Sequence, residues 1–90
     1  MKYSFSKHAF TRMAERKVSP AEVKAVIETG KVIQKYPDDR PYPSRLILGY
    51  SGQRPLHVVS AYNAQEDTEF VITVYEPTTE QWSDNYNKRR

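Results

Sequence analysis

Histidine, tyrosine, arginine and lysine are the side chains through which this sequence could do chemistry. His8, Arg12 and Arg16 recur about one helical turn apart near the N-terminus, so a helix would align them along one stripe. Arginine clamps a phosphate with paired hydrogen bonds, and a neighbouring histidine can move a proton. The spacing predicts a phosphate-binding or acid–base site, although a helix face turned away from the core is polar in any case.

A second histidine and a tyrosine lie in segments that alternate like strands. His57 stands between Leu56 and Val58, and Tyr75 ends the last predicted strand. We expect His57 or His8 to act as a general base and Tyr75 as an acid or positioning group. The alternative is structural, with His57 in the core and Tyr75 covering a core edge. An odd-length loop between the two strands would put both side chains on one face, and an even-length loop would separate them.

A proline-rich loop at residues 37–44 is the third candidate. Arg40 and Tyr42 lie in it and Arg45 follows it, while its three prolines limit the loop's freedom. An aromatic ring flanked by arginines suits stacking of a nucleobase together with phosphate contact. The alternative is an ion pair between Arg40 and a neighbouring aspartate.

The sequence lacks the residues that several classes of enzyme chemistry require. The chain has no cysteine, and its two histidines form no HExxH pattern. Its three glycines form no phosphate loop and no dinucleotide fingerprint, and a GxSxG elbow is missing. We therefore expect no metal and no cofactor. Metal-free RNA cleavage remains, in which a base activates the 2′-hydroxyl, cations stabilise the phosphorane and an acid protonates the leaving oxygen.

Length and charge indicate one small, mildly basic domain. The chain has 90 residues and a net charge of +3. Eight basic residues against three acidic ones lie within residues 1–35, whereas residues 66–90 carry three basic and six acidic ones. The basic third permits a nucleic-acid partner without requiring one. No apolar run has the ~20 residues of a membrane helix, and no signal peptide is recognisable, so we expect a cytoplasmic protein.

Local patterns predict an α+β fold. Ser6 can cap a helix over residues 7–17, and Ser19 with Glu22 forms a capping box for a helix over residues 20–29. We expect the two N-terminal helices to pack on a four-stranded antiparallel sheet followed by a short C-terminal helix and a frayed tail. The strands are predicted at 31–36, 45–50, 54–62 and 68–75, the last helix at 78–82 and the tail at 85–90.

Four segments together carry a resemblance to a known family: FSKHA…RM…ER at 5–16, YPDD…PYPS at 36–44, GQRPLHVV at 52–59 and ITVYEP at 72–77. They resemble small bacterial proteins catalogued as domain of unknown function 4258. That family looks like a relative of the BrnT and RelE toxins, many of which are metal-independent endoribonucleases of type II toxin–antitoxin systems. The resemblance implies a RelE/BrnT-like fold, RNA as substrate and a small zinc-finger antitoxin of the MqsA type as partner. Residues of the type used by RelE-like nucleases are Arg45, His57 and Tyr75.

The leading hypothesis is a toxin-like, metal-independent endoribonuclease with a single domain over residues 1–90. Arg12 and Arg45 would clamp phosphate, and Arg16, Arg40 and Tyr42 would add RNA contacts. A non-catalytic module that binds nucleic acid or protein is the alternative, and a homodimer that buries the open sheet face is also possible.

Overall fold

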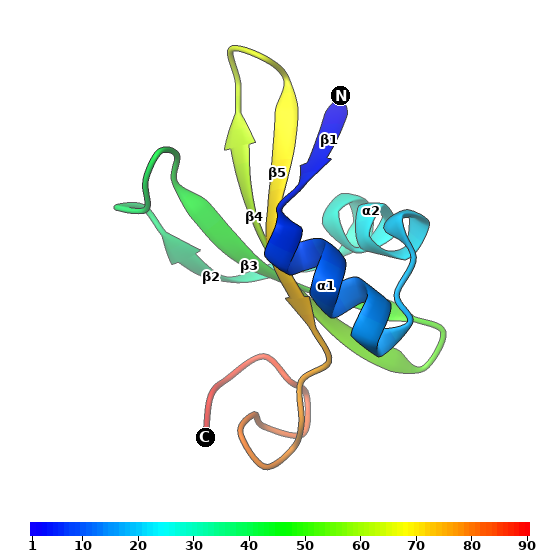
Figure 1. Ribbon diagram of the computed structural model, residues 1–90. Helices are drawn as coiled ribbons and strands as arrows, with labels where there is room; N and C mark the ends of the chain where they lie inside the picture. Colours follow the sequence, from blue (N-terminus) through cyan, green and yellow to red (C-terminus); the bar gives the residue numbers. More distant parts are fainter.

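The computed structural model describes residues 1–90 as two helices and one five-stranded sheet (Figure 1). In space the strands follow the order β1-β5-β4-β3-β2. Neighbouring strands are antiparallel except for β1, which pairs in parallel with β5. The elements in chain order are β1 (Lys2–Phe5), α1 (Lys7–Arg16), α2 (Pro20–Thr29), β2 (Lys31–Tyr36), β3 (Ser44–Ser51), β4 (Arg54–Asn63) and β5 (Thr68–Tyr75).

Two expectations about the fold were wrong: the sheet is mixed and five-stranded, and the C-terminal helix is missing. The strand β1 has four residues, and its partner strand begins 66 positions later, at Thr68 opposite Lys2. Such a pairing leaves no local pattern in the sequence. After Pro77 the chain makes a single turn, in which Gln81 and Trp82 donate backbone hydrogen bonds to the Thr78 carbonyl. One turn is too short to be stable as a helix, because nucleation costs more than a few hydrogen bonds return.

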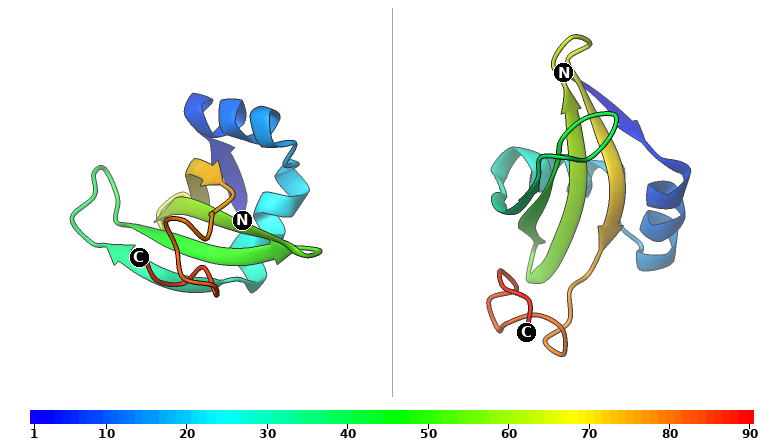
Figure 2. Two further views of the ribbon diagram at one scale, coloured as in Figure 1. Left: turned by 90° about the horizontal axis from the view of Figure 1, so that it is seen from below. Right: turned by 90° about the vertical axis from the view of Figure 1, so that its left-hand side faces the viewer.

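Local signals do account for both helices. The Ser6 side chain accepts a hydrogen bond from the Ala9 amide, and Ser19 and Glu22 form the expected capping box. Both helices lie on the same side of the sheet, as Figure 2 shows in its left view. They bury their apolar stripes against that face, and α2 packs closely on β3 because Gly49 has no side chain to keep Val26 away. Neither helix has the length and apolar character needed to cross a bilayer.

The C-terminal segment, residues 78–90, folds back beneath the lower end of the sheet (Figure 1). Trp82 is only 4% exposed and forms a bridge with Arg89. The Arg90 amide donates to the Gln81 carbonyl at 2.8 Å, so the tail that we expected to fray is tied to the segment before it. This segment covers side chains on the sheet face that the helices leave open.

A β-bulge in β5 decides which residues face each other across β4 and β5. Val59 pairs with Thr73, but the next residue of β4, Ser60, pairs with Val71, so Ile72 is an extra residue. The loop between the strands has an even number of residues, 64–67, which by itself would separate His57 and Tyr75. The bulge restores the match and places His57 directly opposite Tyr75.

Candidate functional site

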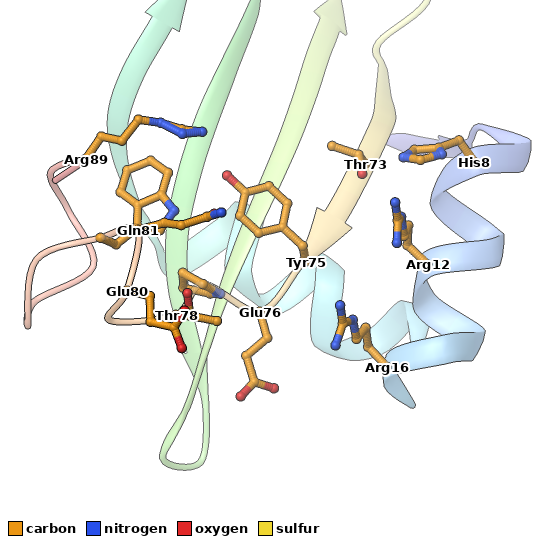
Figure 3. Close-up of a pocket in the computed structure, with 12 residues that line it drawn as sticks. His8, Arg12, Arg16, Thr73, Tyr75, Glu76, Thr78, Glu80, Gln81 and Arg89 are labelled. Carbon is orange, nitrogen blue, oxygen red and sulfur yellow. The ribbon is translucent and has the colours of Figure 1, made fainter.

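A groove of about 550 Å³ lies between α1 and the C-terminal segment, over the end of β5. We call it the α1 groove. Figure 3 shows His8, Arg12 and Arg16 reaching from α1 toward Thr73 and Tyr75, with Arg89 and Gln81 on the far side. The stripe expected along the first helix therefore forms one wall of a groove.

The arginines of the α1 groove differ in whether a neighbouring carboxylate or aromatic ring already contacts them. Arg12 lies 3.4 Å from Glu15 in an exposed pair that contributes little to stability. Arg16 forms no ion pair. The Arg89 guanidinium lies 5.2 Å from the centre of the Trp82 ring, which fixes this cation against a buried aromatic face. These positive side chains remain able to contact an anion.

Carboxylates also line the α1 groove. Glu76 and Glu80 lie at the lower rim in Figure 3, whereas His8 and Arg12 lie at the upper right. The groove is therefore cationic along α1 and acidic at its lower rim, so an anionic ligand would lie toward α1.

The buried His57 pairs with Tyr75, which is half-buried and lines the α1 groove. The His57 side chain is fully buried, and its Nε2 lies 2.8 Å from the Tyr86 carbonyl oxygen. A carbonyl only accepts, so Nε2 carries the proton and donates it. Nδ1 then accepts from the Tyr75 hydroxyl at 3.1 Å. Trp82 packs edge-on against the imidazole, with ring centres 4.4 Å apart.

Burial shapes the ionisation of this pair. It lowers the pKa of His57 below its ordinary value, because the charged imidazolium loses its hydration. It raises the pKa of Tyr75, whose phenolate would be desolvated in the same way. Both groups are thus neutral near pH 7, and both nitrogens of His57 already have partners. Through these two hydrogen bonds His57 attaches the C-terminal segment, at Tyr86, to strands β4 and β5.

Arg45 lies away from the α1 groove, in an ion pair with Glu69. Glu69 is 1% exposed and accepts from the Arg45 guanidinium on both carboxylate oxygens. A buried carboxylate without its cation would cost several kcal/mol, roughly 3–5. The contacts of Arg45 therefore indicate a structural role.

Arg40 and Tyr42 line a second cavity, of about 410 Å³, which we call the Tyr42 cavity. The Tyr42 ring stacks on Phe70, with centres 6.1 Å apart and planes 12° apart. The Tyr42 hydroxyl accepts a hydrogen bond from Asn63 at 2.9 Å. Arg40 is exposed and makes no ion pair, and the neighbouring Asp39 accepts from the Ser44 hydroxyl.

The structure thus gathers four of the eight candidate residues, His8, Arg12, Arg16 and Tyr75, around one groove. Arg89 and Trp82 belong to the same region and were missed, because the segment that carries them was expected to be a surface helix and a frayed tail. The sequence held one signal for them: its single tryptophan lies there, and so large an apolar ring is rarely left exposed. Nowhere do three or more His, Asp or Glu side chains gather as they would around a metal ion.

Comparison with known proteins identifies a family. Neither the curated proteins nor the solved structures gave a match to this chain. The family described as "Domain of unknown function (DUF4258)" matches residues 5–76, which include α1, both histidines and all of β5. The chain therefore belongs to the DUF4258 family.

Proposed function

We propose that this protein is a toxin-like, metal-independent endoribonuclease that binds the RNA backbone in the α1 groove. The observation that carries the proposal is the convergence of His8, Arg12, Arg16 and Arg89 on one groove. Guanidinium groups match phosphate oxygens in charge and geometry, and they would stabilise the extra negative charge of a phosphorane.

The proposed chemistry assigns the general base to His8. His57 has both ring nitrogens occupied, whereas His8 is exposed and lines the groove one turn from Arg12. In the reaction His8 takes the proton of a 2′-hydroxyl, the 2′-oxygen bonds to phosphorus, and the bond from phosphorus to the 5′-oxygen breaks. Water in the open groove protonates the leaving oxygen. The products are a 2′,3′-cyclic phosphate and a 5′-hydroxyl.

The test is incubation of single-stranded RNA with purified protein in EDTA. We expect cleavage, and we expect a DNA strand of the same sequence to stay intact because it lacks the 2′-hydroxyl. His8→Ala should lower the rate at least about a hundredfold, which is typical for loss of a general base. Lys31→Ala, which removes an exposed cation on β2 at the opposite edge of the sheet, is the matched control and should be neutral.

The toxin assignment has its own test in growing cells. Induced expression should arrest growth, and co-expression of a small zinc-finger antitoxin of the kind that the resemblance implies should restore it. Normal growth together with intact RNA from a folded protein would overturn the endoribonuclease proposal.

A non-catalytic binding module is the second candidate. One observation favours it: the polar groups of His57 and Tyr75 are taken up by each other and by Tyr86, so this pair is not free for catalysis. In that case Arg12→Ala and Arg16→Ala would weaken RNA binding. Neither the wild type nor any variant would cleave the RNA.

A further inference from the structure

We propose that the Tyr42 cavity holds a nucleobase of a single-stranded RNA whose backbone lies in the α1 groove. This inference rests on the proposed function and deepens it, because phosphate contacts alone carry no information about bases. It assigns an element of substrate recognition to a cavity outside the α1 groove.

The first support is the continuity of the two cavities along the chain. Phe70 and Ile72 of β5 line the Tyr42 cavity, and Thr73 and Tyr75 of the same strand line the α1 groove. A regular strand rises about 3.3 Å per residue and the bulge at Ile72 shortens this stretch, so Phe70 and Thr73 are at most about 10 Å apart along β5. Strand β1 ends at Phe5 opposite Val71, so β1 does not pair with residues 72–75 of β5, and we expect one extended ligand to contact both cavities.

The second support is a platform of aromatic rings. Tyr42 and Phe70 are half-buried and nearly parallel, 12° apart. The hydrogen bond that Tyr42 accepts from Asn63 holds its ring in place, so little freedom is lost when a ligand binds. Ile72 lines the same cavity and is 38% exposed, which extends the apolar surface. Such a platform suits a planar base, because every base has a face that can stack on an aromatic ring.

The third support is the pair of opposite charges at the rim of the cavity. One carboxylate oxygen of Asp39 accepts from Ser44 and the other can still accept, while Arg40 offers donors; both residues line the Tyr42 cavity. The edge of a nucleobase carries donors and acceptors side by side and can use both groups. A peptide could meet both groups only through its backbone or a second side chain, whereas a base presents its stacking face and its polar edge together. The lining therefore favours a nucleobase over a peptide.

The experiment compares two RNAs that differ only in their bases. A short 2′-O-methyl RNA, which cannot be cleaved through its 2′-position, is compared with an analogue that is abasic at its central positions. We expect the wild type to bind the first RNA at least about fivefold more tightly, since stacking contributes roughly that factor or more per base. Fluorescence anisotropy of labelled RNA measures both affinities.

Matched variants test whether the preference for the intact RNA over the abasic analogue arises in the Tyr42 cavity. Tyr42→Leu and Phe70→Leu keep apolar volume but remove a ring, so each should bring the two affinities close together. Tyr42→Phe keeps the ring and loses only the hydroxyl, so it should still discriminate. Circular dichroism and an unfolding curve establish that each variant is folded. A variant that fails this check is replaced by Arg40→Ala, which removes a donor to the base edge and should therefore weaken the intact RNA more than the abasic analogue.

The outcomes separate this inference from the proposal beneath it. If the wild type binds both RNAs equally while Arg12→Ala weakens both, the base site is overturned and the phosphate site stands, which would leave the Tyr42 cavity to a protein ligand. If Tyr42→Leu weakens both RNAs by the same factor, Tyr42 only positions its loop and the inference is again overturned. If neither RNA binds, the proposed function fails first.

Discussion

At the scale of single residues, a histidine that the sequence nominates for catalysis makes contacts within the fold through both of its ring nitrogens. The neutral imidazole of His57 donates to the Tyr86 carbonyl and accepts from the Tyr75 hydroxyl, so it links β4, β5 and the C-terminal segment. Burial favours the neutral form and lowers the pKa of His57 from its ordinary value of 6.5. His8 lies on the surface and has no such partners.

The pH dependence of stability should report this difference between the two histidines. In the folded state His57 resists protonation, so below pH 6.5 the unfolded chain binds the proton more readily. The contribution of His57 is therefore complete above pH 6.5 and declines as the pH falls toward its lowered pKa. Urea unfolding over a pH series measures this. His57→Gln should remove that part of the dependence, and His8→Gln should retain it.

A pH profile of His57→Gln that matches the wild type would contradict the assignment. Loss of the dependence in His8→Gln instead would contradict it as well.

At the scale of elements, one carboxylate ties α2 to the sheet and to α1. Glu22 accepts from the Ser19 amide at 2.8 Å, from the Ser51 hydroxyl and from Arg54 at 3.2 Å. Arg54 also donates to the carbonyl oxygens of Arg16 and Lys17, where α1 ends. This network helps to hold α1 in position and thereby fixes the wall of the α1 groove.

Loss of the Glu22 carboxylate should destabilise the protein in a pH-dependent way. Hydrogen bonds from Ser51 and Ser19 lower its pKa from 4.5 to about 2. The carboxylate therefore stabilises the fold above pH 4.5, and its contribution disappears as the pH falls toward about 2. We expect Glu22→Gln to cost about 1–2 kcal/mol at neutral pH and to flatten the acid limb of the stability curve. Urea unfolding over a pH series measures the cost at neutral pH and the shape of the acid limb. Glu28→Gln, which changes an exposed carboxylate on the same helix, is the control and should leave both unchanged.

At the scale of the whole molecule, the C-terminal segment joins the fold to the candidate site. Trp82 packs edge-on against His57, and the Arg89 guanidinium lies over its ring. The family match ends at residue 76, so this segment lies beyond the part of the chain that identifies the family.

Substitution of Trp82 should therefore affect stability and RNA binding together. We expect Trp82→Ala to lower the free energy of unfolding by about 3–5 kcal/mol, because it leaves a large cavity over His57. Trp82→Phe should cost much less and keep most of the binding. Thermal unfolding and anisotropy titrations measure the two effects. An unchanged melting temperature for Trp82→Ala would mean that the segment is not docked.

The distribution of charge over the molecule predicts how binding responds to salt. RNA binding should weaken steeply as salt rises, because bound phosphates release counterions. Arg12→Ala should lower the magnitude of the slope of log K against log salt by about 0.7, the value for one contact to a single strand. Lys31→Ala should leave the slope unchanged. A salt-insensitive affinity would argue against phosphate contacts.

The sequence by itself determined the parts of this protein that depend on neighbours in the chain. Ser6, Ser19 and Glu22 set the starts of both helices, since caps act within one turn. The helical period likewise aligned His8, Arg12 and Arg16. Four of the five strands could be predicted from alternation and turn residues, but β1 could not, because only its distant pairing with β5 makes it a strand.

Tertiary structure decided what depends on contacts between distant segments. The extra residue at Ile72 brings His57 opposite Tyr75, which the even loop alone would have prevented. Docking of the C-terminal segment then occupies the second nitrogen of His57 and places Arg89 in the α1 groove. Burial, register and docking arise only once the chain has closed on itself, so residue types and spacing could nominate these side chains but could not separate the structural histidine from the one that lines the groove.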